Sequence, residues 1–239
     1  MRENTDVIIL CGGRGSRLRP LTDDMPKAMT PVLGRPMISH IIDFYHQNSF
    51  PRATICTGYK GNMLRESVVA PSPEMKILFS DAGEQASMVQ RLIAAGIDTN
   101  ARTVVSYGDT FINLDMDRIL EHHQRNDAAL TIITAKITNP FGLVTYESGD
   151  KVSSFVEKPV LNYYIGCFVV EQSAFEFLTD QMLEAPDGEG LVMFFQALAV
   201  AGKLGGCEHE GLHITFNTEP EMRKANQQME QFYTLQEKS

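Results

Sequence analysis

A glycine-rich segment near the N-terminus carries the residues best suited to chemistry in this chain. The apolar run 7–11 breaks into the sequence GGRGSRLR at residues 12–19, and Pro26-Lys27-Ala28 follows shortly afterwards. An apolar run that ends at glycines is typical of a buried strand entering a loop. Glycines let backbone N–H groups surround an anion, and arginines supply forked, permanently charged donors for phosphate. The segment therefore indicates a loop that binds a triphosphate.

Two other phosphate-binding motifs fit this segment poorly. A dinucleotide fingerprint requires G-x-G-x-x-G, and Leu18 stands where the third glycine should be. A P-loop requires Gly-Lys-Ser/Thr, whereas Gly15 is followed by Ser16 and Arg17. A turn that only reverses the chain would not explain three arginines within six residues. The triphosphate interpretation is favoured.

Alternating strands and helices are expected to position this loop. Apolar runs predict strands at 7–11, 53–57, 75–79 and 103–107, and helical periodicity predicts helices at 37–47 and 87–95. Such alternation is typical of a parallel sheet covered by helices on both faces, and ligands bind at the carboxyl ends of its strands. The glycine-rich loop and Asp109 both follow such strands, so we expect them to meet in one pocket.

The second half of the chain changes character. Strands separated by short connections are expected at 129–135, 143–146, 152–156 and 163–170, and we interpret them as an antiparallel extension that could form a second wall of the cleft. Helices are expected at 173–182, 191–201 and 220–235. The predicted fold class is α/β, with a Rossmann-like mixed, mainly parallel central sheet flanked by helices and a small antiparallel extension on the substrate side.

Composition limits the classes of function. A length of 239 residues fits a single domain over 1–239, and the net charge of −9 argues against nucleic acid as a partner. The four cysteines lie far apart without a C-x-x-C pair, which is typical of buried, reduced thiols in a cytoplasmic protein. We see no signal peptide and no apolar segment long enough for a membrane span, so no membrane partner is expected.

The motifs together resemble a known family. GGRGSRL at 12–18 with Pro26-Lys27 is similar to the signature of the sugar-1-phosphate nucleotidylyltransferases, and Tyr107-Gly108-Asp109, Phe141-Gly142 and FVEKP at 155–159 follow in the family's order. These later pieces are most similar to the glucose-1-phosphate cytidylyltransferase-like branch, and the resemblance extends to about Phe168. It implies the nucleotide-diphospho-sugar transferase fold and transfer of a nucleotidyl group from a nucleoside triphosphate to a sugar 1-phosphate. It also implies Mg²⁺ as cofactor, CTP as first choice of nucleotide with GTP next, and a possible homo-oligomer.

The resemblance assigns roles by position. Residues 1–127 would form mainly the nucleotide-binding half, 128–218 mainly the sugar-phosphate half, and 219–239 a C-terminal helix. Arg17 and Lys27 would be catalytic, and Asp109 and Asn217 would hold the metal. The residues expected to bind the nucleotide are Leu10, Gly12, Gly13, Arg14, Gly15, Ser16, Gly83 and Gly108. Those expected to bind the sugar phosphate are Gly142, Glu157, Lys158 and Gly166.

The sequence departs from the family pattern at three places. Asn217 stands where family members carry an aspartate, and it could instead cap the final helix. Ile165-Gly166 stands where Asn-Gly is usual, which suggests an altered acceptor. The segment 87–92 lacks the family's small glycines before Arg-Leu, which leaves the base open. Gln85 and Gln90 could contact the base edge or be exposed helix residues.

Two alternatives remain for function, and two histidine motifs need an interpretation. The N-terminal signature is shared with enzymes that act on phosphocholine or a phosphonate, and Asn217 also allows a non-catalytic nucleotide sensor. His209-Glu210-Gly211-Leu212-His213 matches H-E-x-x-H, but that zinc motif works only on a helix, and we expect a turn between two strands here. His122-His123 is interpreted as a solvated pair at a helix end.

Overall fold

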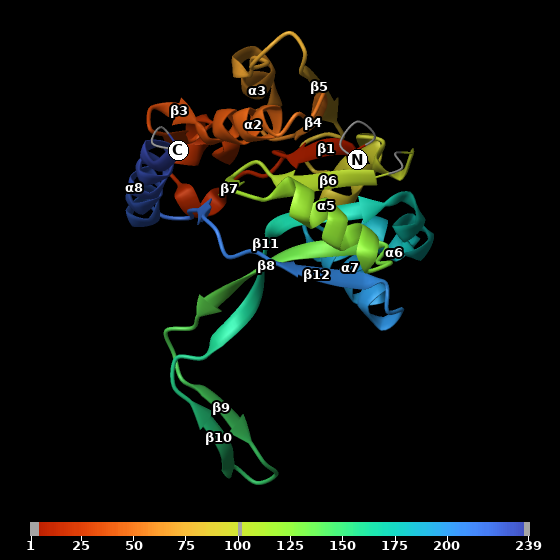
Figure 1. Cartoon of the computed structure of the whole chain (residues 1–239), viewed down its shortest axis with the longest axis vertical. Helices are drawn as coiled ribbons and strands as arrows, with labels where there is room; N and C mark the ends of the chain where they lie inside the picture. Colours follow the sequence, from red (N-terminus) through yellow and green to blue (C-terminus); the bar gives the residue numbers. More distant parts are fainter. Residues whose placement is uncertain (1–4, 100–101, 237–239) are drawn as a thin grey trace.

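The computed structural model describes residues 5–99 and 102–236, and a seven-stranded sheet forms its centre (Figure 1). The strand order is β12-β8-β11-β6-β1-β4-β5. β1, β4, β5 and β6 are mutually parallel neighbours, β12 is parallel to β8, and β11 runs antiparallel to both β8 and β6. The strands are β1 Thr5–Leu10, β4 Arg52–Thr57, β5 Lys76–Asp81, β6 Arg102–Tyr107, β8 Leu130–Thr138, β11 Val160–Glu171 and β12 Leu204–Glu208.

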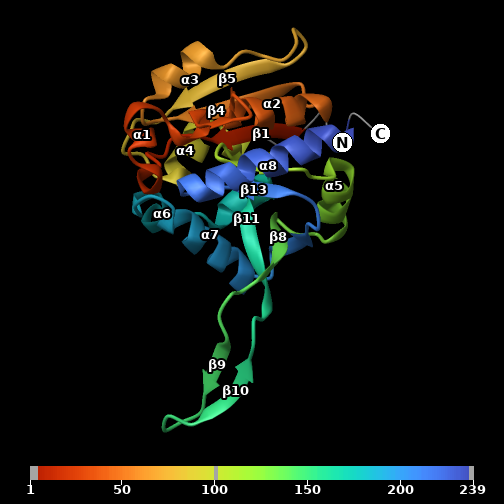
Figure 2. The same cartoon turned by 90° about the vertical axis from the view of Figure 1, so that its left-hand side faces the viewer.

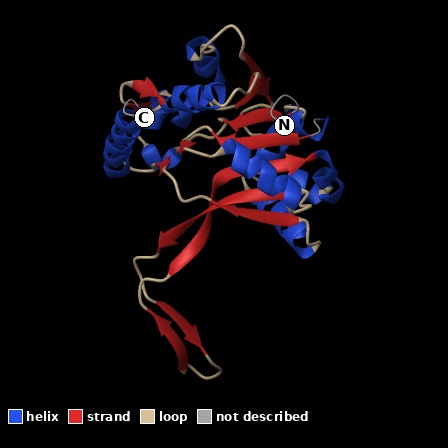
Figure 3. Ribbon diagram, viewed as in Figure 1, coloured by secondary structure: helices blue, strands red, loops and turns tan. Residues whose placement is uncertain are grey.

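Helices cover both faces of this sheet, as Figure 3 shows. They are α1 Leu21–Asp24, α2 Met37–Gln47, α3 Gly61–Ser67, α4 Met88–Ala94, α5 Met116–Arg125, α6 Asp180–Glu184, α7 Glu189–Val200 and α8 Glu219–Gln236. Short antiparallel pairs join β2 Pro31–Val32 to β3 Arg35–Pro36, β7 Thr110–Ile112 to β13 His213–Thr215, and β9 Leu143–Tyr146 to β10 Val152–Val156. The predicted fold class is confirmed.

The apolar run of β1 is buried on both faces because its side chains alternate between two cores. Val7 and Ile9 pack in one cluster with α2, while Ile8 and Leu10 pack in the other with α4 and α7. Alternation of this kind follows from the two-residue period of a strand. A shift of one residue would exchange these side chains between the two cores and disturb the packing of both, so the carboxyl end of the strand is held in place.

Most expected elements agree with the structure within a few residues. α2 and the strands of the β9–β10 hairpin have the predicted bounds. The helix expected at 173–182 is wrong as one element: a 3-10 turn covers Gln172–Phe177, and α6 begins only at Asp180. The Oγ1 of Thr179 accepts a hydrogen bond from the N–H of Met182 at 3.4 Å, so a new N-cap starts a separate helix there. Residues 237–239 of the expected C-terminal segment and 1–4 of the expected domain lie outside the described residues.

The connection 209–212 joins two strands, β12 and β13, as expected. It is not helical, and the residues that the structure describes contain no group of three or more metal-binding side chains. All four cysteines are buried free thiols. None of the described helices is long and apolar enough to cross a lipid bilayer.

The antiparallel extension lies in an unexpected place. We call residues 136–163 the arm: the outer parts of β8 and β11 together with the β9–β10 hairpin. In Figures 1 and 2 the hairpin projects away from the sheet and its helices. The expectation that this extension forms a second wall of the cleft is therefore wrong, because no arm residue lines the cleft and the β8–β11 ladder continues away from it through Ala135↔Tyr163 to Thr138↔Val160.

A buried polar network lies at the other end of the strands. His123 is only 1% exposed, so its interpretation as part of a solvated pair is wrong. Its Nδ1 lies 2.7 Å from the Oγ1 of Thr131, and its Nε2 lies 3.1 Å from the Oε1 of Glu171. The Nε of Arg102 donates to the same Glu171 oxygen at 2.6 Å. His123 lies on the buried face of α5 together with Met116, Ile119 and Leu120. The polar composition of this helix end does not show that one of its two histidines faces the core.

This network predicts a pH-dependent stability. Burial raises the pKa of Glu171, but hydrogen bonds from His123 and Arg102 outweigh it, so the net pKa lies below its ordinary value of 4.5. A carboxyl group with a lowered pKa in the folded state contributes stability above its unfolded pKa, and loses it as the pH falls through the folded pKa. We expect Glu171→Gln to reduce the free energy of unfolding at neutral pH, and the difference from wild type to shrink below about pH 4.5. Urea unfolding of both proteins across pH measures this, and a difference that stays constant into the acid range would contradict it.

Candidate active site

One cleft of about 520 Å³ opens at the carboxyl ends of the parallel strands. Its volume falls in the range of small-molecule sites. The glycine-rich loop, the segment before α4, the end of β6 and the segment before α8 all contribute to it. The lining residues that the argument uses are Gly12, Arg14, Arg17, Lys27, Glu84, Gln85, Arg91, Tyr107, Asp109 and Asn217. Leu10, Gly13, Gly15 and Ser16 also line it, as expected for the loop.

The parallel register brings the two expected parts of the site together. Leu10 at the end of β1 is paired with Tyr107 at the end of β6, and the N–H of Gly108 donates to the carbonyl of Leu10 at 2.9 Å. A Cβ on residue 108 would lie 2.2 Å from the Sγ of Cys11, so only glycine fits this crossing. Burial raises the pKa of Cys11 well above its ordinary value, which keeps the thiol protonated and makes it a packing residue rather than a nucleophile.

Gly15 links the loop to the catalytic lysine predicted from the sequence. Its φ is +63°, and a Cβ there would lie 2.8 Å from the Cβ of Lys27. Glycine therefore meets both the left-handed backbone and the close approach. The buried Thr22 fastens this turn, since its Oγ1 donates to the carbonyl of Gly15 at 2.9 Å. The loop and Lys27 thus form one packed unit.

The ammonium of Lys27 lies between two oxygens at the edge of the cleft. Its Nζ is 2.7 Å from the Oδ2 of Asp109 and donates to the Oδ1 of Asn217 at 3.1 Å. The short β7–β13 ladder makes this meeting possible, because Thr110 pairs with Thr215 and so aligns the residues beyond each strand. The side chain of Lys27 is 11% exposed and that of Asp109 is 28% exposed, so the pair is partly shielded from water.

The same two oxygens are suited to a metal ion. They come from one carboxylate and one amide, they already converge on a single cationic group, and they belong to the class of oxygen ligands that Mg²⁺ prefers. Mg²⁺ usually takes only one or two carboxylates from the protein and completes its shell with waters and substrate phosphates. Asp109 and Asn217 therefore fit a magnesium site that needs a phosphate to complete it.

Asn217 does not cap the final helix. Thr218 does so: its Oγ1 accepts from the N–H of Glu221 at 3.4 Å, and the Oε2 of Glu221 accepts from the N–H of Asn217 at 2.6 Å. This arrangement resembles a capping box and satisfies the helix start without the Asn217 side chain. The amide is left free to contact Lys27.

Arg14 and Arg19 differ in position. Arg14 lines the cleft and its Nη2 lies 2.6 Å from the Oε1 of Glu84, which joins the glycine-rich loop to the segment before α4. Arg19 forms an exposed ion pair with Asp23 at 3.1 Å and does not line the cleft. Only Arg14 is in a position to assist Arg17.

The residues expected near the base also differ in whether they line the cleft. Gln85 lines the cleft, whereas the side chain of Gln90 accepts from the N–H of Ser87 at 2.9 Å in a capping box at the start of α4. Gly83 has a φ of +90° and turns the chain before these residues without lining the cleft itself. Gln85 is therefore the better candidate for a contact with the base.

Arg91 is a site residue that the sequence analysis missed. It is 5% exposed, and its guanidinium donates to the carbonyl of Thr57 and, at 3.0 Å, to the carbonyl of Glu84. Burial lowers its pKa, an effect that the nearby Cys56, Asp81 and Glu84 oppose. Its position within the apolar face of a helix was the signal that could have revealed it.

The expected sugar-phosphate residues are separated from this cleft. Gly142, Glu157 and Lys158 lie on the arm, and none of them lines the cleft. Gly166 lies in the body of β11, where a Cβ would come within 3.0 Å of the Tyr107 ring, and its φ is +85°. The structure therefore brings the expected catalytic and metal residues and most of the expected nucleotide residues to one cleft, while Gly83, Gly108 and the arm residues do not line it.

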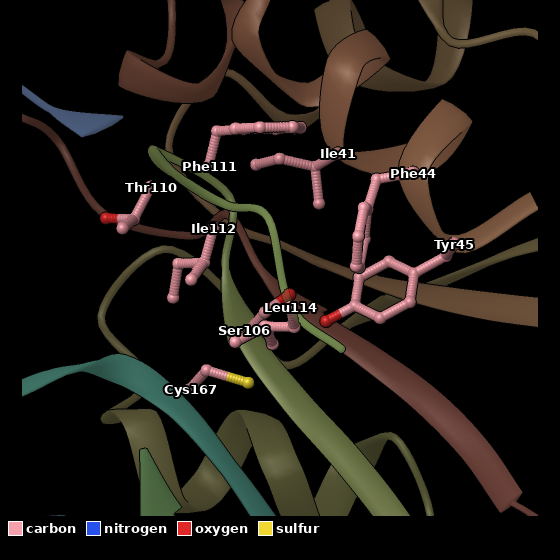
Figure 4. Close-up of a pocket in the computed structure, with 9 residues that line it drawn as sticks. All are labelled: Ile41, Phe44, Tyr45, Ser106, Thr110, Phe111, Ile112, Leu114 and Cys167. Atoms are coloured by element: carbon pink, nitrogen blue, oxygen red, sulfur yellow. The ribbon is translucent and has the colours of Figure 1, made fainter. Parts of the chain in front are cut away.

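A second cavity lies in the hydrophobic core under α2 and holds only about 10 Å³ (Figure 4). Tyr45, Ser106 and Cys167 are among its lining residues. A space of this size can hold one water molecule at most. It is a packing defect and not a ligand site.

Comparison with known proteins identifies the family of this chain. The family model for nucleotidyl transferases matches residues 6–201, so the chain belongs to the nucleotidyl transferase family. It is a nucleotidyltransferase by fold and family.

Its relatives carry different nucleotides in their names. The chain is 25% identical to a probable glucose-1-phosphate cytidylyltransferase of Bacillus subtilis, with 94% of this chain and 96% of the relative covered. It is 27% identical to a mannose-1-phosphate guanylyltransferase of Mycobacterium tuberculosis over 72% of this chain and half of the relative. A crystal structure of a putative glucose-1-phosphate thymidylyltransferase from Bacillus anthracis, in complex with a sucrose, is similar in fold, with a TM-score of 0.71 and 22% identity over 93% of this chain and 94% of the other.

The packing beneath the loop predicts a sharp difference between two neighbouring glycines. A Cβ on residue 12 would lie 2.3 Å from the Cζ of Arg91, whereas a Cβ on residue 13 would meet nothing within 4 Å. We expect Gly12→Ala to destabilise the fold by about 1–3 kcal/mol through overpacking, and Gly13→Ala to change stability by less than about 0.5 kcal/mol. Thermal and urea unfolding of the two variants measure this. Equal stability of both variants would remove Arg91 as the support of the loop.

Proposed function

We propose that this chain transfers a nucleotidyl group from a nucleoside triphosphate to a sugar 1-phosphate and releases pyrophosphate. Mg²⁺ is the proposed cofactor, CTP the preferred nucleotide and GTP the next. The observation that carries the proposal is the meeting of Lys27, Asp109 and Asn217 at the edge of the cleft that the glycine-rich loop borders. The match over nearly the whole length of a probable glucose-1-phosphate cytidylyltransferase supports both the sugar phosphate and CTP.

The chemistry requires two polyanions to approach each other. An oxygen of the sugar phosphate attacks the α-phosphorus in line, and the bond from that phosphorus to the pyrophosphate oxygen breaks. The protein has little covalent chemistry to perform in such a transfer, so catalysis depends on positioning the two substrates and on neutralising their charge. The proposed halves divide this work: residues 1–127 hold the nucleotide, 128–218 hold the acceptor, and the C-terminal helix closes the unit.

Each site residue has a definite task in this proposal. The N–H groups of the glycine-rich loop hold the triphosphate, and Arg17 neutralises charge on the leaving pyrophosphate. Lys27 contacts the α-phosphate: an ammonium has three N–H groups, Asp109 and Asn217 engage two of them, and one remains for phosphate. Mg²⁺, when bound by Asp109 and Asn217, would add positive charge to the phosphate oxygens.

The proposed cellular location of this protein is based on its four cysteine thiols. Four buried free cysteines are typical of a protein in a reducing compartment, and the cytoplasm is the proposed location.

A substrate panel tests the proposed function. Pyrophosphate release is measured with CTP, GTP, UTP and dTTP, each combined with glucose 1-phosphate, mannose 1-phosphate, phosphocholine and a phosphonate. We expect the highest turnover with CTP and a sugar 1-phosphate. Turnover with phosphocholine or a phosphonate alone would identify the alternative acceptor class. Measurable nucleotide binding without turnover for any pair would identify a nucleotide sensor.

The variant Arg17→Ala tests the catalytic role of Arg17 in the same pyrophosphate-release assay. We expect kcat to fall by about 10²–10³-fold, because a group that stabilises developing charge is lost. Arg17 is exposed, so the melting temperature should stay close to that of wild type. Arg19→Ala is the control, since Arg19 lies on the same loop outside the cleft and pairs with Asp23. Equal activity of the two variants would remove Arg17 from the mechanism.

Asn217→Asp tests the metal site separately. A second carboxylate beside Asp109 adds the charge that Mg²⁺ favours, so we expect the half-saturating Mg²⁺ concentration to fall several-fold. Calorimetric titration of Mg²⁺ in the presence of a non-hydrolysable nucleotide measures this without turnover. Asn217→Ala should weaken the binding. An unchanged titration in both variants would place the metal elsewhere.

A further inference from the structure

One carboxylate at the wall of the cleft has no task in the site described above. Among the described residues that line the cleft, three carry a carboxylate: Glu84, Asp109 and Asp187. Glu84 is paired with Arg14, and Asp109 is paired with Lys27. The side chain of Asp187 is exposed and forms neither an ion pair nor a hydrogen bond with any residue that the structure describes. It is therefore available to accept hydrogen bonds from a bound molecule.

Asp187 lies at the end of the cleft that is opposite to the metal and phosphate residues. At one end, Lys27, Asp109 and Asn217 meet just before α8, which packs in the same core cluster as α2. At the other end, Gln85 precedes α4 and Asp187 precedes α7, and these two helices pack in the second cluster, on the opposite face of the sheet. A nucleotide whose α-phosphate contacts Lys27 therefore has the end with Gln85 and Asp187 left for its base.

The backbone fixes the position of Asp187. Its carbonyl accepts a hydrogen bond from the N–H of Met88 at 2.8 Å, which joins the connection between α6 and α7 to the first turn of α4. Gly190 allows the two helices to approach closely, because a Cβ there would lie 2.0 Å from the carbonyl oxygen of Met182. The φ of Asp187 is +46°, in the left-handed region that Asp and Asn tolerate better than most residues. The turn explains an aspartate or an asparagine at this position, but it does not require a charge.

A carboxylate beside an amide can distinguish bases by the hydrogen bonds that they form. A carboxylate only accepts hydrogen bonds, whereas the amide of Gln85 both donates and accepts. Cytosine has an amino group at C4 next to the acceptor N3, so it can donate to Asp187 and accept from Gln85; carboxylates are the usual acceptors for this amino group. Uracil has a carbonyl oxygen in place of the amino group, and that oxygen would face the carboxylate without a proton between them.

From this placement we infer that Asp187 recognises the amino group of the nucleobase, so that the cleft selects cytosine over uracil. The inference rests on the nucleotide site of the proposed function, because the base reaches Asp187 only if the α-phosphate binds at Lys27. Guanine also presents N–H donors on its edge and is compatible with the carboxylate. Thymine has the same carbonyl oxygen as uracil and is rejected with it. One side chain thus accounts for CTP and GTP being preferred to UTP and dTTP.

Nucleotide binding without turnover tests the inference. CTP and UTP are titrated calorimetrically into wild type and Asp187→Asn with Mg²⁺ present and no acceptor. We expect wild type to bind CTP about 10–100-fold more tightly than UTP. The amide of Asp187→Asn can turn either its oxygen or its NH₂ group toward the base, so we expect UTP to bind more tightly and the ratio of the two Kd values to fall close to unity. A ratio that stays at the wild-type value overturns the inference.

Two further variants show whether the effect belongs to this carboxylate. Glu184→Gln removes the charge of another exposed carboxylate, at the end of α6 and outside the cleft, and it should leave the ratio unchanged. Asp187→Gly keeps the left-handed backbone and removes the side chain, so it should lower the ratio mainly through weaker binding of CTP. Equal weakening of CTP and UTP in Asp187→Asn would place the carboxylate on the ribose, which the two nucleotides share, and would overturn the assignment to the base.

Pyrophosphate release distinguishes a failure of this inference from a failure of the proposed function. CTP selectivity that depends on Asp187, without turnover for any acceptor, would overturn the proposed function and leave the recognition of the base standing. Equal kcat/KM of wild type for CTP and UTP would overturn the recognition of the base and leave nucleotidyl transfer standing. A wild type that binds neither nucleotide would overturn both.

Discussion

An ammonium group held between two oxygens that lie far apart in the chain is the interaction on which this cleft depends. Lys27, Asp109 and Asn217 come from three segments that share no local pattern. A carboxylate or an ammonium that is partly withdrawn from water is costly without a partner, so each of the three stabilises the position of the others. In the proposed function, phosphates and a divalent cation would exchange contacts with these opposite charges.

The shape of the glycine-rich loop depends on the packing beneath it as well as on its own glycines. Arg91 packs under Gly12 and Gly58 and ties the end of β4 to the segment before α4. In the proposed function, a loop supported in this way would present its N–H groups to a triphosphate without reorganising. Preorganised donors are the usual source of electrostatic stabilisation in catalysis, and here the buried Arg91 would hold them in place.

The two proposed sides of the site differ in how they are built. Strand β1, which leads into the proposed nucleotide side, is buried on both faces and is fixed by packing. Three of the four residues proposed for the acceptor lie on the two-stranded arm, which carries ten of the sixteen exposed large hydrophobic side chains among the described residues. A fold can keep one reaction while its specificity changes, because function resides in sites placed on a common scaffold. The relatives, whose names include three different nucleotides, illustrate such variation.

The sequence by itself determined the strands of the parallel sheet, the bounds of α2 and the place of the glycine-rich loop and Asp109 at strand ends. These features depend on short periodic patterns and on glycine and proline signals, which are local properties of the chain. Only the tertiary structure decided that Asn217 lies beside Lys27, that His123 is buried and that Arg91 supports Gly12. The three-residue strands of the β7–β13 ladder are too short to show a period, and the contacts they create join residues more than a hundred positions apart. The direction of the arm was equally hidden, because short apolar runs separated by turn residues predict a hairpin but do not specify how it projects from the sheet.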